Sequence, residues 1–423
     1  VALVGGELKA VINGLDLAND LSLNGGAIDT NGNSLTLSGV VFGGSDLIKH
    51  GAGTLVLSNS GNSYTGDTLV NDGDVEIAAD NAFGVGGDVV LATGSTLLAG
   101  ANNLTFGNDV YVGLPSAINT GVHTLTLNGA IHDNLAGGTL DKEGTGTLIL
   151  TNGGSDYTGG TNLNAGAINI DSQTALSTGA IIMQDGTSLG GASASNFDIA
   201  NDITINGTST VGANATRFQL DGTVDGTGKL VMTYAGYLVL RGTNTYSGGT
   251  DITSGYVDVS NNDALGTGDL TLGDGAKLGG YALGVTLANN VILSGTTAVI
   301  YASDLTINGD ISGPATLNVL ADSGKLTLTS TNTHAATSIG AGATLVAGAD
   351  VNLGTGALDF AGVGATLEFA NATTFTHNMT MTADGNIDTA GFNGEISGAI
   401  TGAGLVNKAG VGTLTLSNAA NAF

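Results

Sequence analysis

The sequence predicts an all-β protein, a parallel β-helix (β-solenoid) of about nineteen coils, and three observations carry that prediction. The composition favours strands and turns over helices, short strand-like segments recur throughout, and a long repeat runs through most of the chain. The coil number follows from 423 residues at roughly 20–25 residues per coil.

The composition is unusual for a globular protein. Of the 423 residues, 72 are Gly, 2 are Pro and 9 are Lys or Arg, and there is no Cys or Trp. Good helix formers such as Glu, Lys and Arg are scarce, whereas Gly, Asn and Asp favour turns and Thr, Val, Ile and Leu favour strands. Because Cys is absent, disulfides cannot stabilise the fold, and another source of stability is needed.

The formal net charge of −27 excludes whole classes of partner. A nucleic-acid groove needs clustered Lys and Arg, and a basic patch is equally needed to dock on anionic lipid. No apolar run approaches the roughly 18 residues of a membrane helix. We therefore expect no nucleic-acid partner, no insertion of this chain into a membrane, no cofactor and no metal site.

Short alternating segments indicate strands. Pieces such as TLVLSN from Thr54 and TLTLNG at 124–129 alternate apolar and polar residues, and Gly, Asn and Asp separate them. Tandem β-sandwiches of about a hundred residues are the competing architecture. A sandwich needs two inner faces of bulky residues, whereas small aliphatics suit one narrow column, with Gly at sharp corners. The pattern therefore favours the coil.

The repeat has a period of about ninety residues. The pattern G-x-L-x-L occurs five times, at spacings of 93, 90, 88 and 88, and an aromatic residue or His follows each copy. We read residues 1–423 as a single continuous β-helix of four modules and a partial one, at approximately 12–100, 101–193, 194–281, 282–370 and 371–423. The repeat positions to which we assign a structural or export role are Gly53, Leu55, Tyr64, Gly146, Leu148, Tyr157, Gly236, Leu238, Tyr246, Gly412 and Leu414.

The best copy of the repeat is KEGTGTLILTNGGSDYTGGTNLNAGAINI at 142–170. It resembles the passenger-associated repeat of bacterial autotransporters, the type V secretion family, and copies from Lys49 and Lys408 resemble it as well. The copy at 229–259 departs from the pattern in the place of its Lys, and the copy at 325–346 has His in place of Tyr.

The resemblance implies a right-handed β-helix that a C-terminal outer-membrane barrel carries to the bacterial cell surface. No such barrel is expected within these residues, and we expect it in the full-length chain. The last copy stops at Phe423, where the other copies continue, so we expect this sequence to be a piece of a longer protein.

A cluster of tyrosines is the best candidate for a contact surface. Tyr and Arg are favoured at binding hot spots, and six of the nine tyrosines fall between 234 and 301 with an Arg among them. One of the six is the repeat aromatic. The candidate adhesive patch comprises Tyr234, Tyr237, Arg241, Tyr256, Tyr281 and Tyr301.

Signals for catalysis are weak. Carboxylate pairs such as Asp72 with Asp74, or Asp221 with Asp225, could be proposed for glycoside hydrolysis, but such pairs arise by chance among 36 acidic residues. The five His residues show no metal-ligand spacing. We predict no enzyme. The chain would act as an adhesin or cell-aggregation rod that binds a host surface, a matrix receptor or another copy. A passive export-assisting stalk and a carbohydrate-active β-helix remain the alternatives.

Overall fold

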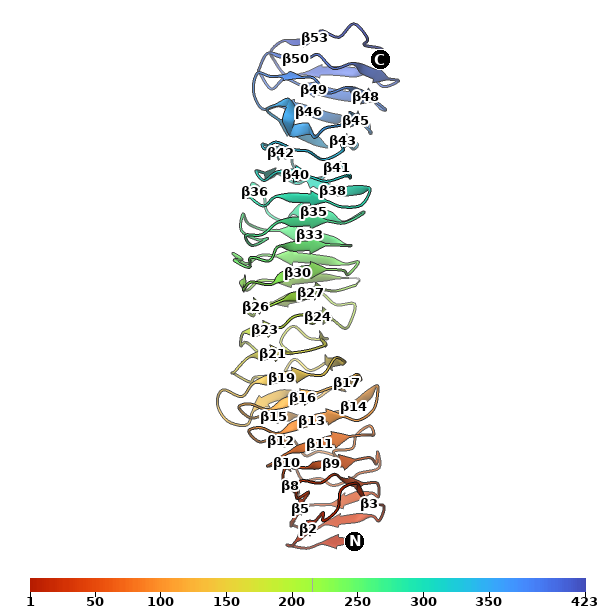
Figure 1. The fold of residues 1–423 in the computed structure, drawn as a ribbon, viewed down its shortest axis with the longest axis vertical. Coiled ribbons are helices and arrows are strands. Elements are labelled where there is room, and N and C mark those ends of the chain that lie inside the picture. The colour runs from red at the N-terminus through yellow and green to blue at the C-terminus, as the bar shows by residue number, and fades with distance from the viewer. Residues whose placement is uncertain (215) are drawn as a thin grey trace. The chain divides into compact units, whose positions relative to one another are not determined.

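The computed structural model describes residues 1–214 and 216–423, and it confirms an all-β parallel solenoid of about 20 turns. The chain forms two compact units, Val1–Thr210 and Val211–Phe423, and each is described by itself. Figure 1 shows short strands stacked in chain order within each unit. Among the described residues, the only helical element is the 3-10 helix η1 (Asp350–Leu353). In the same residues, no helix has the length and apolarity needed to cross a membrane.

The strands of the first unit are mostly three or four residues long and fall into stacked sheets. A short sheet contains β1 (Ala2–Leu3), β4 (Leu21–Leu23) and β7 (Val41–Gly43). The next contains β2 (Glu7–Lys9), β5 (Ala27–Asp29), β8 (Leu47–His50), β10 (Thr68–Val70), β12 (Val89–Leu91), β15 (Val110–Val112) and β18 (Ile131–Asp133). A third contains β3 (Leu15–Leu17), β6 (Leu35–Leu37), β9 (Thr54–Leu57), β11 (Asp74–Ile77), β13 (Thr96–Ala99), β16 (Ala117–Asn119), β19 (Leu140–Glu143), β21 (Thr161–Leu163), β23 (Ile181–Met183) and β26 (Ile203–Ile205). A fourth contains β14 (Leu104–Phe106), β17 (Thr124–Leu127), β20 (Thr147–Leu150), β22 (Ala167–Ile170), β24 (Ser188–Gly191) and β27 (Thr208–Gly212). The last strand of this unit, β25 (Phe197–Ile199), belongs to none of these four sheets.

The second unit follows the same plan. One sheet contains β30 (Lys229–Met232), β32 (Thr250–Ile252), β34 (Leu270–Leu272), β37 (Val291–Leu293) and β40 (Ile311–Ser312). The next contains β28 (Arg217–Leu220), β31 (Tyr237–Leu240), β33 (Tyr256–Val259), β35 (Lys277–Gly280), β38 (Thr297–Ala302), β41 (Thr316–Ala321), β43 (Ala336–Ile339), β45 (Leu358–Phe360), β48 (Met379–Met381) and β51 (Ile400–Gly402). A third sheet contains β36 (Val285–Leu287), β39 (Leu305–Ile307), β42 (Leu326–Leu328), β44 (Thr344–Ala347), β46 (Ala365–Phe369), β49 (Gly385–Asp388) and β52 (Val406–Ala409). A short sheet contains β47 (Thr374–Phe375), β50 (Gly394–Ile396) and β53 (Leu414–Leu416). The remaining strand of this unit is β29 (Val224–Asp225).

Every strand pairing with a given register is parallel, and equivalent side chains stack from coil to coil. Leu55 pairs with Val75, Val75 with Leu97 and Leu97 with Ile118, and all four are fully buried. The alternation of apolar and polar residues thus becomes an inward and an outward row on each sheet. Within each unit, the core is a column of mainly aliphatic side chains.

Equivalent features of successive modules turn from one sheet to the next. Along a single sheet, four coils use ten strands, as from β9 through β11, β13 and β16 to β19. Equivalent strands of the repeat are eleven apart, because β8 corresponds to β19 in the first unit, and β30 to β41 and β52 in the second. Each module is therefore four coils and one further strand, so its features do not line up in a ladder.

Candidate functional site

The repeat aromatics lie inside the core. Each phenol hydroxyl is 2.6 Å from the hydroxyl of the Thr four residues later, and burial raises the pKa of each phenol above its ordinary value. The hydrogen bond satisfies a hydroxyl that would otherwise be costly to bury. The three pairs are Tyr64–Thr68, Tyr157–Thr161 and Tyr246–Thr250.

His334 takes the place of the tyrosine in the fourth module. Its Nε2 lies 2.7 Å from Thr337 Oγ1, and that hydroxyl donates to the carbonyl of Leu353 at 2.8 Å. Nε2 therefore donates to Thr337, and the Nδ1 atom is buried without a hydrogen-bond partner in the described part of the chain. Burial lowers the pKa of His334 to about 4, so the imidazole is neutral at pH 7.

The glycines of G-x-L-x-L sit where adjacent coils approach closely. A Cβ at Gly53 would lie 2.6 Å from the backbone nitrogen of Asn33, and one at Gly146 would lie 2.6 Å from that of His123. At Gly236 it would lie 2.6 Å from the carbonyl of Thr216. The leucines that follow, Leu55, Leu148 and Leu238, are fully buried. In the last module, Gly412 has a φ of +104° and Leu414 is half-buried.

A buried asparagine two residues before the aromatic links three coils, and the sequence analysis missed it. The Oδ1 of Asn62 accepts from the Val41 amide at 2.8 Å, and its Nδ2 donates to the Ala82 carbonyl at 2.7 Å. Asn244 and Asn332 repeat both bonds in their modules. The fixed offset N-x-aromatic was the signal that could have found them.

Lysines Lys49 and Lys142 are also fully buried, although the sequence analysis gave them no role. The Lys49 ammonium donates to the carbonyls of Gly51 at 2.6 Å and Asp72 at 2.7 Å. That of Lys142 donates to carbonyls on its own coil and on the next. Burial lowers the pKa of each lysine to about 8.

The structure brings most of the predicted patch together on the outward face of one sheet in the second unit. The rings of Tyr237 and Tyr256 meet edge-on with centroids 4.8 Å apart, and those of Tyr256 and Tyr301 are 5.1 Å apart. Tyr256 reaches Tyr301 over Gly279, which leaves room because it has no side chain. The three rings form a continuous aromatic row over β31, β33 and β38.

Arg241 and Tyr281 form a second contact on the same sheet, just after β31 and β35. The Arg241 guanidinium lies 5.7 Å from the centre of the Tyr281 ring and 3.5 Å from Asp221. Tyr237 and Tyr281 are each 49% exposed. Tyr234 lies in the turn between β30 and β31, where its ring packs over Gly212. We define the tyrosine surface as Tyr237, Arg241, Tyr256, Tyr281 and Tyr301.

Asp258 lies beside the aromatic row and was not predicted. It is the outward residue two positions after Tyr256 on β33, and its Oδ1 is buried without a hydrogen-bond partner among the described residues. Burial raises its pKa to about 6, and the nearby Asp322 adds to the shift. Burial also raises the pKa of Tyr256, with Asp258 as a further cause. The Tyr256 hydroxyl is the polar neighbour of the Asp258 carboxyl, and it holds the pKa of Asp258 below the value that burial alone would give.

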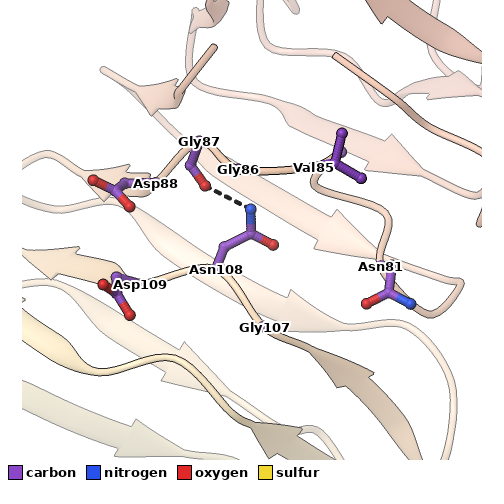
Figure 2. A pocket seen from close by; sticks show the side chains of 9 residues that line it. Asn81, Val85, Gly86, Gly87, Asp88, Gly107, Asn108 and Asp109 are labelled. Carbon is purple, nitrogen blue, oxygen red and sulfur yellow. Dashed lines mark hydrogen bonds between the residues drawn. The ribbon is translucent and has the colours of Figure 1, made fainter. Parts of the chain in front are cut away.

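A hollow in the first unit has a simpler origin. Figure 2 shows Asp88 and Asp109 on neighbouring segments and the Asn108 amide reaching the Gly87 carbonyl, a 2.6 Å hydrogen bond. From Ala82 to the next strand the chain has one residue more than the matching loops from Ala175 and Ala264. The extra residue makes a bulge of Val85, Gly86 and Gly87, and the hollow lies beside it.

Comparison with known proteins accounts for the repeat. The model of the passenger-associated transport repeat matches residues 47–77, 140–170, 230–259, 320–347 and 406–423. The first four of these segments contain the buried Tyr or His, and all five contain a close-packed Gly. The five copies support an autotransporter passenger segment.

One curated relative of this passenger segment is the adhesin BmaC autotransporter of Brucella suis biovar 1 (strain 1330). It is 36% identical over 152 residues, which are 35% of this chain and 4% of the relative. The passenger segment therefore spans only a small part of that protein's length. No solved structure matches it significantly.

The described residues of the passenger segment form no group of three or more His, Asp or Glu side chains able to hold a metal ion. Of the carboxylates considered in the sequence, Asp221 interacts with Arg241 and accepts from Gln219. The Asp72 carbonyl faces the Lys49 ammonium. No catalytic family is indicated by the comparisons.

Proposed function

We propose that this passenger segment is an adhesin that binds sugar chains through the tyrosine surface. The observation that carries the proposal is the aromatic row of Tyr237, Tyr256 and Tyr301, flanked by the Arg241–Tyr281 pair. Aromatic rings and Arg give large contact area at low conformational cost. The name of the relative, an adhesin, supports the same general role.

The chemistry of the surface fits a polyhydroxylated partner. The apolar faces of sugar rings pack on aromatic rings, and sugar hydroxyls both donate and accept hydrogen bonds. The Asp258 carboxyl beside Tyr256 offers acceptor oxygens, and Arg241 and Lys277 offer exposed donors. Tyr237 and Tyr281, each 49% exposed, present ring surface to such a partner.

Charge sets this face apart from the rest of the chain. Both arginines of the sequence lie on it: Arg217 pairs in register with Tyr237, and Arg241 lies over Tyr281. Lys277 also lies on this face, because it pairs with Tyr256. The acidic groups beside them are Asp221, Asp258 and Asp322, so three basic groups meet three acidic ones. Elsewhere 6 basic groups (9 − 3) face 33 acidic ones (36 − 3). A neutral or acidic sugar chain therefore meets least repulsion here.

The same charge argues against self-association as the main activity. Two copies that each carry −27 repel one another at low ionic strength. Homotypic clumping, which the sequence also suggested, therefore ranks below adhesion to a sugar-bearing surface. The proposal also takes residues 1–423 as one continuous β-helix located at the bacterial cell surface, as the sequence analysis expected.

The test uses beads coated with the segment and surfaces coated with dextran, with a polyuronate, with casein or with the segment itself. The double variant Tyr237→Ala/Tyr281→Ala should lose binding to the saccharide surfaces by about tenfold or more. Both rings are half exposed, so the fold tolerates their loss. Tyr111→Ala, which removes a tyrosine from the outward face of β15 in the first unit, is the matched control.

Each outcome assigns the function. Retention on dextran or on the polyuronate that only the double variant loses supports the sugar-binding adhesin. Retention on the segment-coated surface alone would instead make it an aggregation rod. If coated beads behave like blank beads on every surface, the segment is a passive stalk and the proposal is wrong.

A further inference from the structure

The repeat lysines occupy a position where a charge is unexpected. Lys49 pairs in register with Val70, and Lys142 with Leu163, so both point inward within the aliphatic column. Both are 0% exposed. The groups around Lys49 are Thr30 on the preceding coil and the acidic side chains Asp29, Asp72 and Asp74, whereas Glu143 is the acidic neighbour of Lys142.

The ammonium groups are held by backbone carbonyls from two coils. Lys142 Nζ donates to the carbonyls of Glu143 and Gly144, both at 2.8 Å, in the turn that follows its own strand. It also donates to the carbonyl of Ala165 at 3.1 Å, which belongs to the next coil. Lys49 does the same with Gly51 and, on the next coil, Asp72. A complete cage therefore needs the following coil.

In the third module the residue at the position of the lysine is uncharged. Met232 pairs with Ile252, the register position of Lys49 and Lys142, and it is fully buried. The two turn carbonyls, those of Thr233 and Tyr234, accept from Ser254 Oγ at 2.6 and 3.2 Å. Ser254 is the counterpart of Ala165. The turn thus requires a donor, and a hydroxyl on the next coil serves as well as an internal ammonium.

Lys408 is the lysine of the last repeat copy. It pairs with Ile387 and holds its own turn carbonyls, Ala409 at 2.8 Å and Gly410 at 2.9 Å, as Lys142 does. Unlike Lys49 and Lys142, it is exposed.

We propose that the repeat lysine protects the open end of a folding solenoid, a role that we call edge guard. The lysine is charged and exposed while its coil is the last one folded, and backbone carbonyls enclose it once the next coil docks. An open strand edge above an apolar core is a template for aggregation, and an inward-pointing Lys is a known means of blocking it. After docking, the same group becomes a hydrogen-bond link between coils.

The guard matters most for a chain that folds coil by coil. In three of the five repeat copies, those with Lys49, Lys142 and Lys408, the growing end carries a charge in place of an apolar side chain. A serine such as Ser254 satisfies the finished turn but lies on the following coil, so it cannot protect the open end. The two solutions should be equal in stability and unequal during folding.

The test uses the full chain and three variants. Lys142→Met leaves the turn carbonyls without a donor, and Lys142→Met/Ala165→Ser adds the donor that the third module uses. Lys229→Met removes an exposed lysine that pairs with Asp251 on the outside of the solenoid, and it controls for loss of charge. Urea midpoints report stability, and light scattering after dilution from urea reports aggregation during refolding.

We expect the single variant to have a lowered midpoint and the double variant to recover it. The double variant should nevertheless scatter about twofold more than wild type or Lys229→Met during refolding. Equal scattering by the double variant and wild type would overturn the edge guard. Failure of the midpoint to recover would overturn the equivalence of the two donors on which it rests.

Discussion

The close approach of coils at Gly146 permits a sharp mutational test. An added Cβ would lie 2.6 Å from the backbone nitrogen of His123 and closer still to its carbonyl, whereas ordinary contact begins at 3.4 Å. The shortfall is at least 0.8 Å (3.4 − 2.6 = 0.8). Gly146→Ala can be accommodated only if the strands of adjacent coils separate, because both partners are backbone.

The separation weakens two hydrogen bonds. The Gly146 amide donates to Gly121 at 2.8 Å, and the Thr147 amide donates to His123 at 2.9 Å. Each such bond contributes about 1 kcal/mol net, and overpacking adds about 1–3 kcal/mol. The expected loss is about 3 kcal/mol or more, which lowers the melting temperature of a unit of this size by roughly 6–12 °C.

Circular dichroism melting of the full chain measures this loss. Gly107→Ala is the matched control, because its added Cβ meets nothing within 4 Å and its φ is unstrained. The control should melt within about 1–2 °C of wild type. If Gly146→Ala melts as the control does, the repeat glycine is not needed for coil packing, and its place in G-x-L-x-L needs another cause.

Three further predictions concern buried polar groups. Tyr157→Phe should cost about 1 kcal/mol or more in urea unfolding, and a double-mutant cycle with Thr161→Val should show coupling; additive effects would contradict the hydrogen bond. The folded pKa values of Lys49 and Lys142, about 8, lie below the unfolded value near 10.5. Between these two values the unfolded chain binds more protons than the folded chain, so the free energy of unfolding rises with pH above 8, by up to about 1.4 kcal/mol per pH unit for each lysine. A variant with Met at both positions should lose this slope between pH 8 and 9.5. The folded pKa of His334, about 4, lies below its unfolded value of 6.5, so the stability that the neutral imidazole contributes is lost as the pH falls from 6.5 towards 4. In His334→Gln the free energy of unfolding should change less with pH between 6.5 and 5. An unchanged slope would argue against a buried neutral imidazole.

The solenoid could be predicted because its signals are local and repeated. Alternation in segments such as Thr54–Leu57 gives the inward and outward rows, and Gly and Asn give the turns between them. The period of about ninety residues identified the module. The turn of each module by one sheet could not be predicted, because it depends on how many strands each coil uses.

The buried polar groups were harder to predict from sequence. Lys49 occupies an inward position by alternation with Leu47, but a charge in a core is normally excluded. Only the carbonyls of two stacked coils make that position tolerable, and they come from residues as distant as Asp72. Asn62 was equally hidden, although its offset from Tyr64 recurs in other modules.

The tyrosine surface was predicted in part. Sequence distance suggested that the tyrosines share a face, and the register places Tyr237 beside Tyr256. Tyr256 reaches Tyr301 only because Gly279 separates them, and the sequence gives no sign of that gap. Asp258 was one of many acidic residues until its neighbours were known.

Amide hydrogen exchange tests the central claim most directly, namely that buried polar side chains of the repeat tie each coil to its neighbours. We predict that the strands around Lys49 and Tyr64, and those around Lys142 and Tyr157, exchange more slowly than strands midway between them, such as β13 and β15. Uniform exchange along the first unit, or faster exchange at the repeats, would contradict the account.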